Sequence, residues 1–438
     1  MTYMNSRIST VFFIVILLLA GSLGGLYYVK AEWKPPVLSV TPEHSRASAR
    51  TIFTVTSSDQ DSDLRALRVA IQQGSNTLDI VSKELPEGTT ELREEFSLPK
   101  TGIKNEPLTL TVSVTDTSWH RFGRGNKAQI VRELNIDSKP PMVSILSGQH
   151  NVNQGGAGLL VYSTDEELAM SGVRMGDYFF PGYPYQPGKY LCFFAVPYRL
   201  DSKSVTPSLF ATDLAGNEVS VGFFFRPLPK KFKHDSISIS DNFLQSKMGQ
   251  FTEIYPNLSQ PIDIFLKVNS ELRAKNVNAL LQLGKDTVHQ MLWNGPFIRL
   301  PNSAPMAGFA DNRTYLYQGK AVDNQTHLGV DLASLVASPV PAGNTGRVIL
   351  AEFMGIYGNV VVLDHGFGLQ SLYSHLSEIH VRKGDTVQRG QIIGKTGATG
   401  MAGGDHLHFG MLISGLEVQP IEWWDAHWIR DNITSKLQ

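Results

Sequence analysis

The sequence predicts a mainly β protein with an N-terminal transmembrane helix, two β-sandwich modules, a short helical linker unit and a C-terminal β-rich domain. Three observations support this fold class. An apolar run lies near the start of the chain, and a β-type pattern of about 100 residues then repeats once. The third observation is a C-terminal segment rich in glycine and β-branched residues, in which histidines cluster.

The apolar run extends from Val11 to Val29 and is interrupted only by Ser22 and two tyrosines. Nineteen helical residues are about 28 Å long, enough to cross the hydrocarbon core of a membrane. We therefore expect residues 1–33 to form a cytoplasmic tip and an uncleaved, single-pass anchor in the inner (plasma) membrane, with the bulk of the chain in the periplasm. The alternative is a cleaved signal peptide, because the three residues before Glu32 resemble a small-residue cleavage site.

A tandem repeat follows the anchor. The sequence KPPVLSV at residues 34–40 is echoed by KPPMVSI at residues 139–145. Short alternating runs between Gly, Asn, Asp and Pro are typical of β-sandwiches. The string ATDLAGN at residues 211–217 resembles the end of bacterial immunoglobulin-like modules. We expect such modules at residues 34–138 and 139–228, acting as spacers or binding wall or protein partners.

The remaining chain divides into a basic linker with a helical unit, residues 229–296, and a β-rich domain, residues 297–438. Helical periodicity begins after Ser240, a residue type preferred at helix N-caps. A net charge of −1 argues against a nucleic-acid partner. The single cysteine, Cys192, lies in an apolar run and is expected to be a buried strand residue rather than a reactive thiol.

The histidine cluster contains two short motifs with metal-ligand character. His327 and Asp331 form an HxxxD pair, and His406 and His408 form an HxH pair within a predicted strand. Residues two apart in a strand face the same side. Four extended residues span roughly 13 Å, too far for two ligands of one ion. The HxxxD segment must therefore bend, and Gly329 allows this with least strain. His and Asp are preferred ligands of zinc.

The segments HLGVDLA, YGNVVVLDHGFGLQSLYSHL, VRKGDTVQRGQIIGKTGATG and GGDHLHF, within about residues 300–425, resemble the lysostaphin-like (LytM-type) zinc metallopeptidases that cut peptidoglycan. The resemblance implies that His327, Asp331 and His408 bind one zinc ion. It also implies that His375 and His406 are catalytic residues that act on the attacking water.

Some positions depart from the family pattern or fall outside it. Gly410 follows HLHF, where an acidic residue is commoner; the position is not a ligand, so the difference concerns substrate contacts. His365 and His380 match no catalytic position, and we expect them in a turn and on the surface. Some family members are held latent by an upstream residue at the open zinc position, for which Asn312 and Asn324 are candidates.

The resemblance implies a membrane-anchored zinc metalloendopeptidase that hydrolyses peptide bonds in peptidoglycan stems or cross-bridges. Two alternatives remain: a non-catalytic wall-binding scaffold or activator of other wall hydrolases, and a metallopeptidase that acts on proteins. The expected partners are peptidoglycan, the membrane through residues 11–29, and proteins through the immunoglobulin-like modules.

Overall fold

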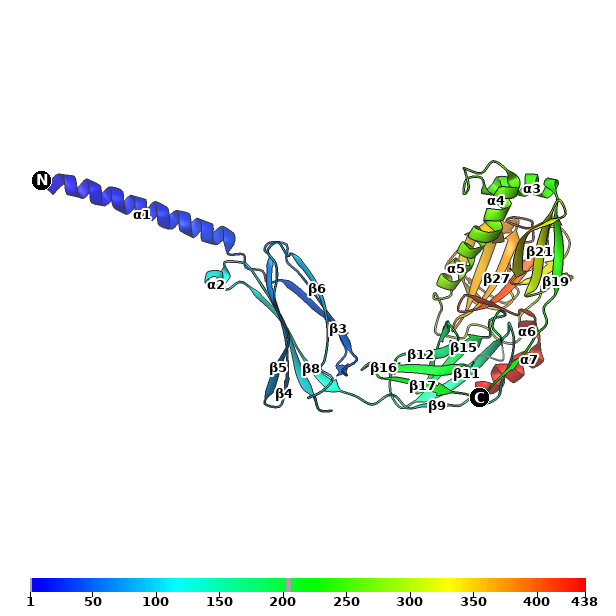
Figure 1. The fold of residues 1–438 in the computed structure, drawn as a ribbon, viewed down its shortest axis with the longest axis horizontal. Coiled ribbons are helices and arrows are strands. Elements are labelled where there is room, and N and C mark those ends of the chain that lie inside the picture. The colour runs from blue at the N-terminus through cyan, green and yellow to red at the C-terminus, as the bar shows by residue number, and fades with distance from the viewer. Residues whose placement is uncertain (1, 202–205) are drawn as a thin grey trace. The chain divides into compact units, whose positions relative to one another are not determined.

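The chain folds as two units in the computed structural model, which describes residues 2–201 and 206–438 (Figure 1). One unit consists of the residues up to 140 together with 212–218, and the other of residues 141–211 together with 219–438. Both units consist mainly of β-strands, which confirms the predicted fold class.

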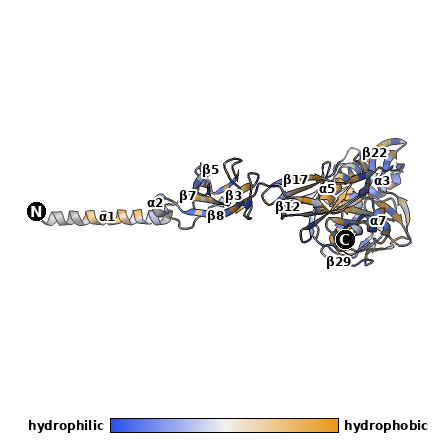
Figure 2. Cartoon of the chain, turned by 90° about the horizontal axis from the view of Figure 1, so that it is seen from below, coloured by the Kyte–Doolittle hydropathy of each residue, from blue (hydrophilic) through white to orange (hydrophobic). Residues whose placement is uncertain are grey.

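Helix α1 (Thr2–Lys30) carries the predicted apolar run. Within it, Thr10–Tyr28 is a 19-residue apolar stretch long enough to cross a membrane. Its large side chains are exposed, among them Phe12 and Leu18 at 67% and 66%, and orange, the hydrophobic colour, marks part of the helix in Figure 2. The apolar helix is thus confirmed; an anchor and a signal sequence share this feature.

Two sheets of the first unit enclose a hydrophobic core. Along β3, Phe53 and Val55 are fully buried while Thr54 between them is not, the alternation expected of a strand with one face on the core. One sheet has the order β1 (Val37–Thr41), β3 (Ile52–Ser58), β6 (Glu91–Ser97); the other has the order β2 (Arg46–Ala47), β8 (Lys127–Ile136), β7 (Leu108–Asp116), β4 (Leu64–Gln73), β5 (Asn76–Glu84). The short helix α2 (His120–Gly123) follows β7.

Residues 143–228 form three further sheets. Cys192 lies in β15 and is fully buried, as predicted. The sheets have the orders β14 (Tyr183–Gln186), β15 (Lys189–Ala195), β11 (Ala157–Thr164), β9 (Val143–Ile145); β13 (Tyr178–Pro181), β12 (Leu168–Met175), β16 (Ser208–Asp213), β17 (Glu218–Gly222); and β10 (His150–Asn153) parallel to β18 (Phe225–Leu228).

The segment expected to be a linker and a helical unit contains both a strand and helices. Ser240 caps α3, because its hydroxyl accepts a hydrogen bond from the Phe243 amide, as predicted. The helices are α3 (Asp241–Met248), η1 (Gly249–Phe251), α4 (Pro261–Lys267), the π-helical η2 (Val268–Leu272) and α5 (Arg273–Leu283). Before them, β19 (His234–Ile239) pairs in parallel with β21 (Asp311–Tyr317) and so joins the β-rich domain instead of bridging to it.

Three sheets make up the C-terminal domain, and the largest of them carries His365, His375 and His408. The large sheet has the order β20 (Ala304–Ala307), β23 (Val330–Ala333), β31 (Leu407–Ile413), β27 (Leu369–Leu376), β26 (Asn359–Gly366), β25 (Gly346–Phe353), β29 (Thr386–Val387), with β32 (Leu416–Val418) beside β31. The smaller sheets are β19-β21-β22, with β22 spanning Lys320–His327, and β24 (Pro339–Pro341), β30 (Ile392–Lys395), β28 (Glu378–Ile379). The short helix η3 (Gly355–Tyr357) connects β25 to β26.

The C-terminal helices pack against strands within residues 143–195, and these helices and strands lie in the second unit. The ring of Trp423 is fully buried, 6.1 Å from that of Phe193. The buried Glu422 carboxylate accepts hydrogen bonds from the Asn153 side chain at 2.7 Å and the Ala157 amide at 3.1 Å. These helices are α6 (Ile421–Trp424), α7 (Ala426–Asn432) and η4 (Thr434–Lys436). One hydrophobic core therefore continues from residues 143–228 into the C-terminal domain.

Candidate metal centre

Three strands bring the HxxxD and HxH motifs together. His327 ends β22, Asp331 lies in β23, and His408 lies in β31. Strands β23 and β31 are antiparallel, with Asp331 directly opposite His408. The chain bends between β22 and β23, where the sequence predicted a bend. A Cβ atom at Gly329 would lie 2.5 Å from the His408 ring, so this position has room only for glycine.

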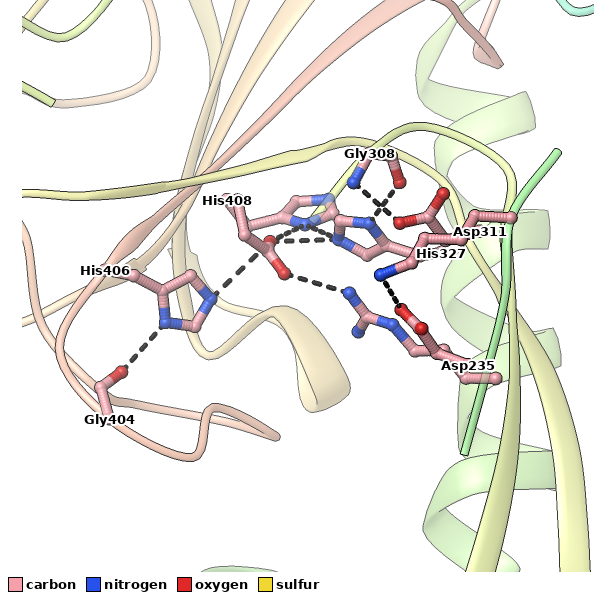
Figure 3. A network of polar contacts seen from close by, with 10 residues as sticks. Asp235, Gly308, Asp311, His327, Gly404, His406 and His408 are labelled. Atoms are coloured by element: carbon pink, nitrogen blue, oxygen red, sulfur yellow. Dashed lines mark hydrogen bonds and ion pairs between the residues drawn. The ribbon is translucent and has the colours of Figure 1, made fainter. Parts of the chain in front are cut away.

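The three side chains converge on one point (Figure 3). The Nε2 atom of His327 lies 2.9 Å from Oδ1 of Asp331 and 2.9 Å from Nδ1 of His408. Nδ1 of His408 is also 2.9 Å from Oδ1 of Asp331. Each residue is buried, at 6 to 8% exposure. The two motifs thus offer three ligand atoms in a nearly equilateral triangle.

The chemistry of these atoms fits a cation. Nδ1 of His327 lies 2.8 Å from the Gly308 carbonyl, which can only accept, so this nitrogen carries the proton and Nε2 presents its lone pair. That lone pair faces a carboxylate oxygen and a second imidazole nitrogen. In tetrahedral zinc coordination, neighbouring ligand atoms are about 3.3 Å apart. The observed spacing of 2.9 Å between the ligand atoms is close to this value. The three residues therefore fit a zinc ion.

Two further histidines lie beside this triangle. The rings of His375 and His406 have centroids 4.9 Å apart, and Nε2 of His406 is 3.5 Å from Oδ1 of Asp331. Each ring is oriented by a backbone carbonyl: Nδ1 of His375 donates to Thr399 and Nδ1 of His406 donates to Gly404. In both neutral rings Nε2 is consequently left to accept a proton.

The backbone at His375 departs from regular strand geometry. Its φ of 62° lies in the left-handed region, which is uncommon for a residue other than glycine. The pairing of β26 with β27 shifts register between Asn359 and Val361, opposite this residue. Such bulges turn a side chain out of its regular direction. The strained conformation at His375 is of the kind that clusters at functional sites.

Burial and mutual contacts shift the pKa values of this cluster. Burial lowers the pKa of His408 to about 4, and burial together with the neighbouring imidazoles holds the pKa of His375 well below its usual range. For Asp331, burial acts to raise the pKa, but the surrounding histidines hold it well below normal. For His406, burial acts to lower the pKa, yet the contact with Asp331 outweighs burial and raises it.

A groove of about 530 Å³ opens over the cluster. The residues that line it include all five site residues and, from the β19-β21-β22 sheet, Ile237, Arg313 and Tyr315. Apolar side chains line much of the rest, namely Ile239, Phe243, Phe265, Met306, Ile356 and Met401. The site thus has a concave, partly apolar approach of a size that holds a short peptide segment.

The structure brings all five predicted site residues together and corrects one other expectation. His365 is fully buried at the end of β26, not in a turn; its Nε2 bonds to the Ser371 hydroxyl at 2.7 Å. His380 is exposed, as predicted, and pairs with Glu378. Among the described residues that line the groove, neither Asn312 nor Asn324 occurs.

The contact that sequence reasoning missed is between Arg313 and Asp331. The guanidinium Nη2 lies 3.1 Å from Oδ2 of the aspartate. Arg313 lies two residues after Asp311, and residues two apart in a strand point to the same face. The sequence could therefore have placed both side chains on one face of a strand. No sequence signal indicated which ligand this face would meet.

The fold and the site define a β-rich domain with a His/Asp/His candidate metal centre in a groove. Comparison with known proteins agrees with this class. The model of peptidase family M23 matches residues 325–420. The chain therefore carries a peptidase family M23 domain at its C-terminal end, which confirms the resemblance seen in the sequence.

Three similar proteins illustrate the match. The peptidoglycan DD-endopeptidase ShyB of Vibrio cholerae is 35% identical over 116 residues, 26% of this chain and 26% of ShyB. Stage II sporulation protein Q of Bacillus subtilis is 36% identical over 101 residues, 22% of this chain and 36% of that protein. The catalytic domain of lysostaphin from Staphylococcus simulans is 30% identical, covering 28% of this chain and 92% of the domain, with a TM-score of 0.25. The chain thus spans about a quarter of the length of ShyB.

Proposed function

We propose that this protein is a zinc metalloendopeptidase that hydrolyses peptide bonds in peptidoglycan stems or cross-bridges. The observation that carries the proposal is the triangle of His327 Nε2, Asp331 Oδ1 and His408 Nδ1, with sides of 2.9 Å, at the floor of a groove. These three residues would hold the metal. A peptidase family M23 domain and a relative named as a peptidoglycan DD-endopeptidase support the substrate class.

His327, Asp331 and His408 would hold a zinc ion, which when bound would supply Lewis-acid chemistry for activating water and polarising the scissile carbonyl. His375 and His406 act on the proton of the attacking water. The carbonyls of Thr399 and Gly404 fix each ring through Nδ1, so each Nε2 is the nitrogen that takes or returns the proton. The ring that has taken the proton stabilises the oxyanion through its protonated Nε2 and then delivers that proton to the leaving amine.

The N-terminal helix supports a location at the membrane. Residues 11–29 would anchor the chain, with the peptidase domain on the outer, periplasmic side where peptidoglycan lies. In this account, residues 34–138 and 139–228 form immunoglobulin-like modules that act as spacers or contact protein partners.

Digestion of purified peptidoglycan sacculi tests the proposal. The full-length protein, purified in detergent, is incubated with sacculi, and the soluble fragments are identified by mass spectrometry. We expect products with a newly formed carboxyl and amino group at one type of peptide bond, and none from the His375→Ala variant. If sacculi bind both proteins equally and neither releases fragments, the protein is a wall-binding scaffold.

A further inference from the structure

The second oxygen of Asp331 has its own partner. While Oδ1 faces the three histidines, Oδ2 lies 3.1 Å from Nη2 of Arg313. The two side chains are only 18% and 11% exposed. Hydrogen bonds between two ionised groups are stronger than those between neutral groups. Arg313 therefore fixes which carboxylate oxygen turns toward the metal position.

Strand β21 is well placed to hold this arginine. It is the middle strand of the β19-β21-β22 sheet, with Asp235 of β19 and Gln325 of β22 opposite Arg313. Its backbone is therefore hydrogen-bonded on both sides. Asp235 already has a cationic partner, because Nζ of Lys233 lies 2.9 Å from its carboxylate. Asp235 is labelled in Figure 3, where a dashed line marks this ion pair.

The same strand face also orients His327. Asp311, two residues before Arg313, lies opposite His327 and accepts a hydrogen bond from the Gly308 amide at 2.8 Å. The Gly308 carbonyl in turn accepts from Nδ1 of His327 at 2.8 Å. One face of β21 thus reaches both residues of the HxxxD motif, one directly and one through Gly308.

We propose that Arg313 is a positioning residue that holds the Asp331 carboxylate with Oδ1 toward the zinc ion. The inference rests on the proposed function, because it assigns a role toward the metal of that site. Groups that orient metal ligands typically change metal affinity by 10- to 100-fold when they are removed. The positive charge of Arg313 also repels a bound cation. If orientation of Asp331 dominates, removing Arg313 weakens zinc binding; if charge repulsion dominates, removing it strengthens zinc binding.

The test is the zinc dissociation constant of the full-length protein in detergent, measured by competition with a chromophoric chelator. Arg313→Met is expected to weaken zinc binding by about 10- to 100-fold and Arg313→Lys by less, because lysine keeps a cationic donor. Lys233→Met is the matched control: it removes a cation that lies next to β19 and pairs with Asp235, without touching Asp331, and its affinity should remain that of the wild type. Asp311→Asn should weaken binding in the same direction as Arg313→Met. If Arg313→Met does not fold, Arg313→Gln replaces it.

The outcomes separate this inference from the proposed function. A wild-type protein without zinc affinity contradicts the proposed function and with it this role. Wild-type zinc binding with unchanged or tighter binding in Arg313→Met overturns the positioning role alone. The positioning role is also overturned if Arg313→Met binds zinc more weakly and its metal-free form unfolds at a lower temperature than the wild type, because the defect is then one of folding. Lost hydrolysis with unchanged zinc affinity also overturns it and assigns Arg313 to the substrate.

Discussion

The substitution Gly329→Ala should disable the metal centre although it replaces none of the proposed ligands. A Cβ atom at this position would lie 2.5 Å from Cε1 and Nε2 of His408 and 2.8 Å from the Phe409 carbonyl oxygen. Ordinary carbon contacts are about 3.5 to 4.0 Å. The His408 ring must therefore move by about 1 Å, or β23 must move away from β31 by a similar distance. Gly329 does not have a positive φ, so the effect is steric and not conformational.

A displacement of about 1 Å at a reacting centre costs on the order of 10²-fold in rate. We expect Gly329→Ala to lose hydrolysis of sacculi by about that factor and to bind zinc more weakly. The control is Gly403→Ala, which changes a glycine that lines the same groove but where an added Cβ would meet no atom within 4 Å. Both variants are assayed for zinc content and for release of peptidoglycan fragments. Wild-type activity in Gly329→Ala would refute the close approach on which this reasoning depends.

Two further predictions concern stability and anchoring. Burial raises the pKa of Glu422 to about 7, from an ordinary value of 4.5. Its protonated form is therefore favoured in the folded state, and the stability it contributes is complete below pH 4.5 and is lost as the pH rises to 7, by about 3 kcal/mol. Glu422→Gln should show less of this loss in denaturant titrations at pH 4.5 and 7.5; equal losses would contradict the shift. If residues 11–29 are an uncleaved anchor, the protein stays with membranes after a carbonate wash, whereas an amino terminus at Glu32 would identify a signal peptide.

Local patterns in the sequence predicted the elements that form close to their own residues. The apolar run predicted α1 and Ser240 predicted the start of α3. Which histidines and aspartate meet at the site was implied by the resemblance to the lysostaphin-like peptidases. These signals depend on residues a few positions apart, where strand or helix geometry fixes the direction of each side chain. The bend at Gly329 followed from the length of an extended strand alone.

The contacts that the sequence did not predict join residues far apart in the chain. Residues 229–296 were expected to be a linker and a helical unit, with no strand. Within them, Ile237 and Ile239 lie in a strand that pairs with β21, which follows all the helices of that segment. His365 was expected in a turn, yet it lies in β26, and its partners, Thr345 and Ser371, lie on neighbouring segments of the fold. Arg313 meets Asp331 although β21 and β23 belong to different sheets.

The most direct test of the proposed centre compares His406→Ala with His408→Ala. The two histidines are two residues apart and both lie beside Asp331, but only His408 is assigned to the metal. His408→Ala should lose zinc and hydrolysis together. His406→Ala should keep zinc and lose hydrolysis by about 10²- to 10⁴-fold, the usual cost of removing a proton-transfer group. Equal zinc loss in both variants, or full zinc content in His408→Ala, would contradict the assignment.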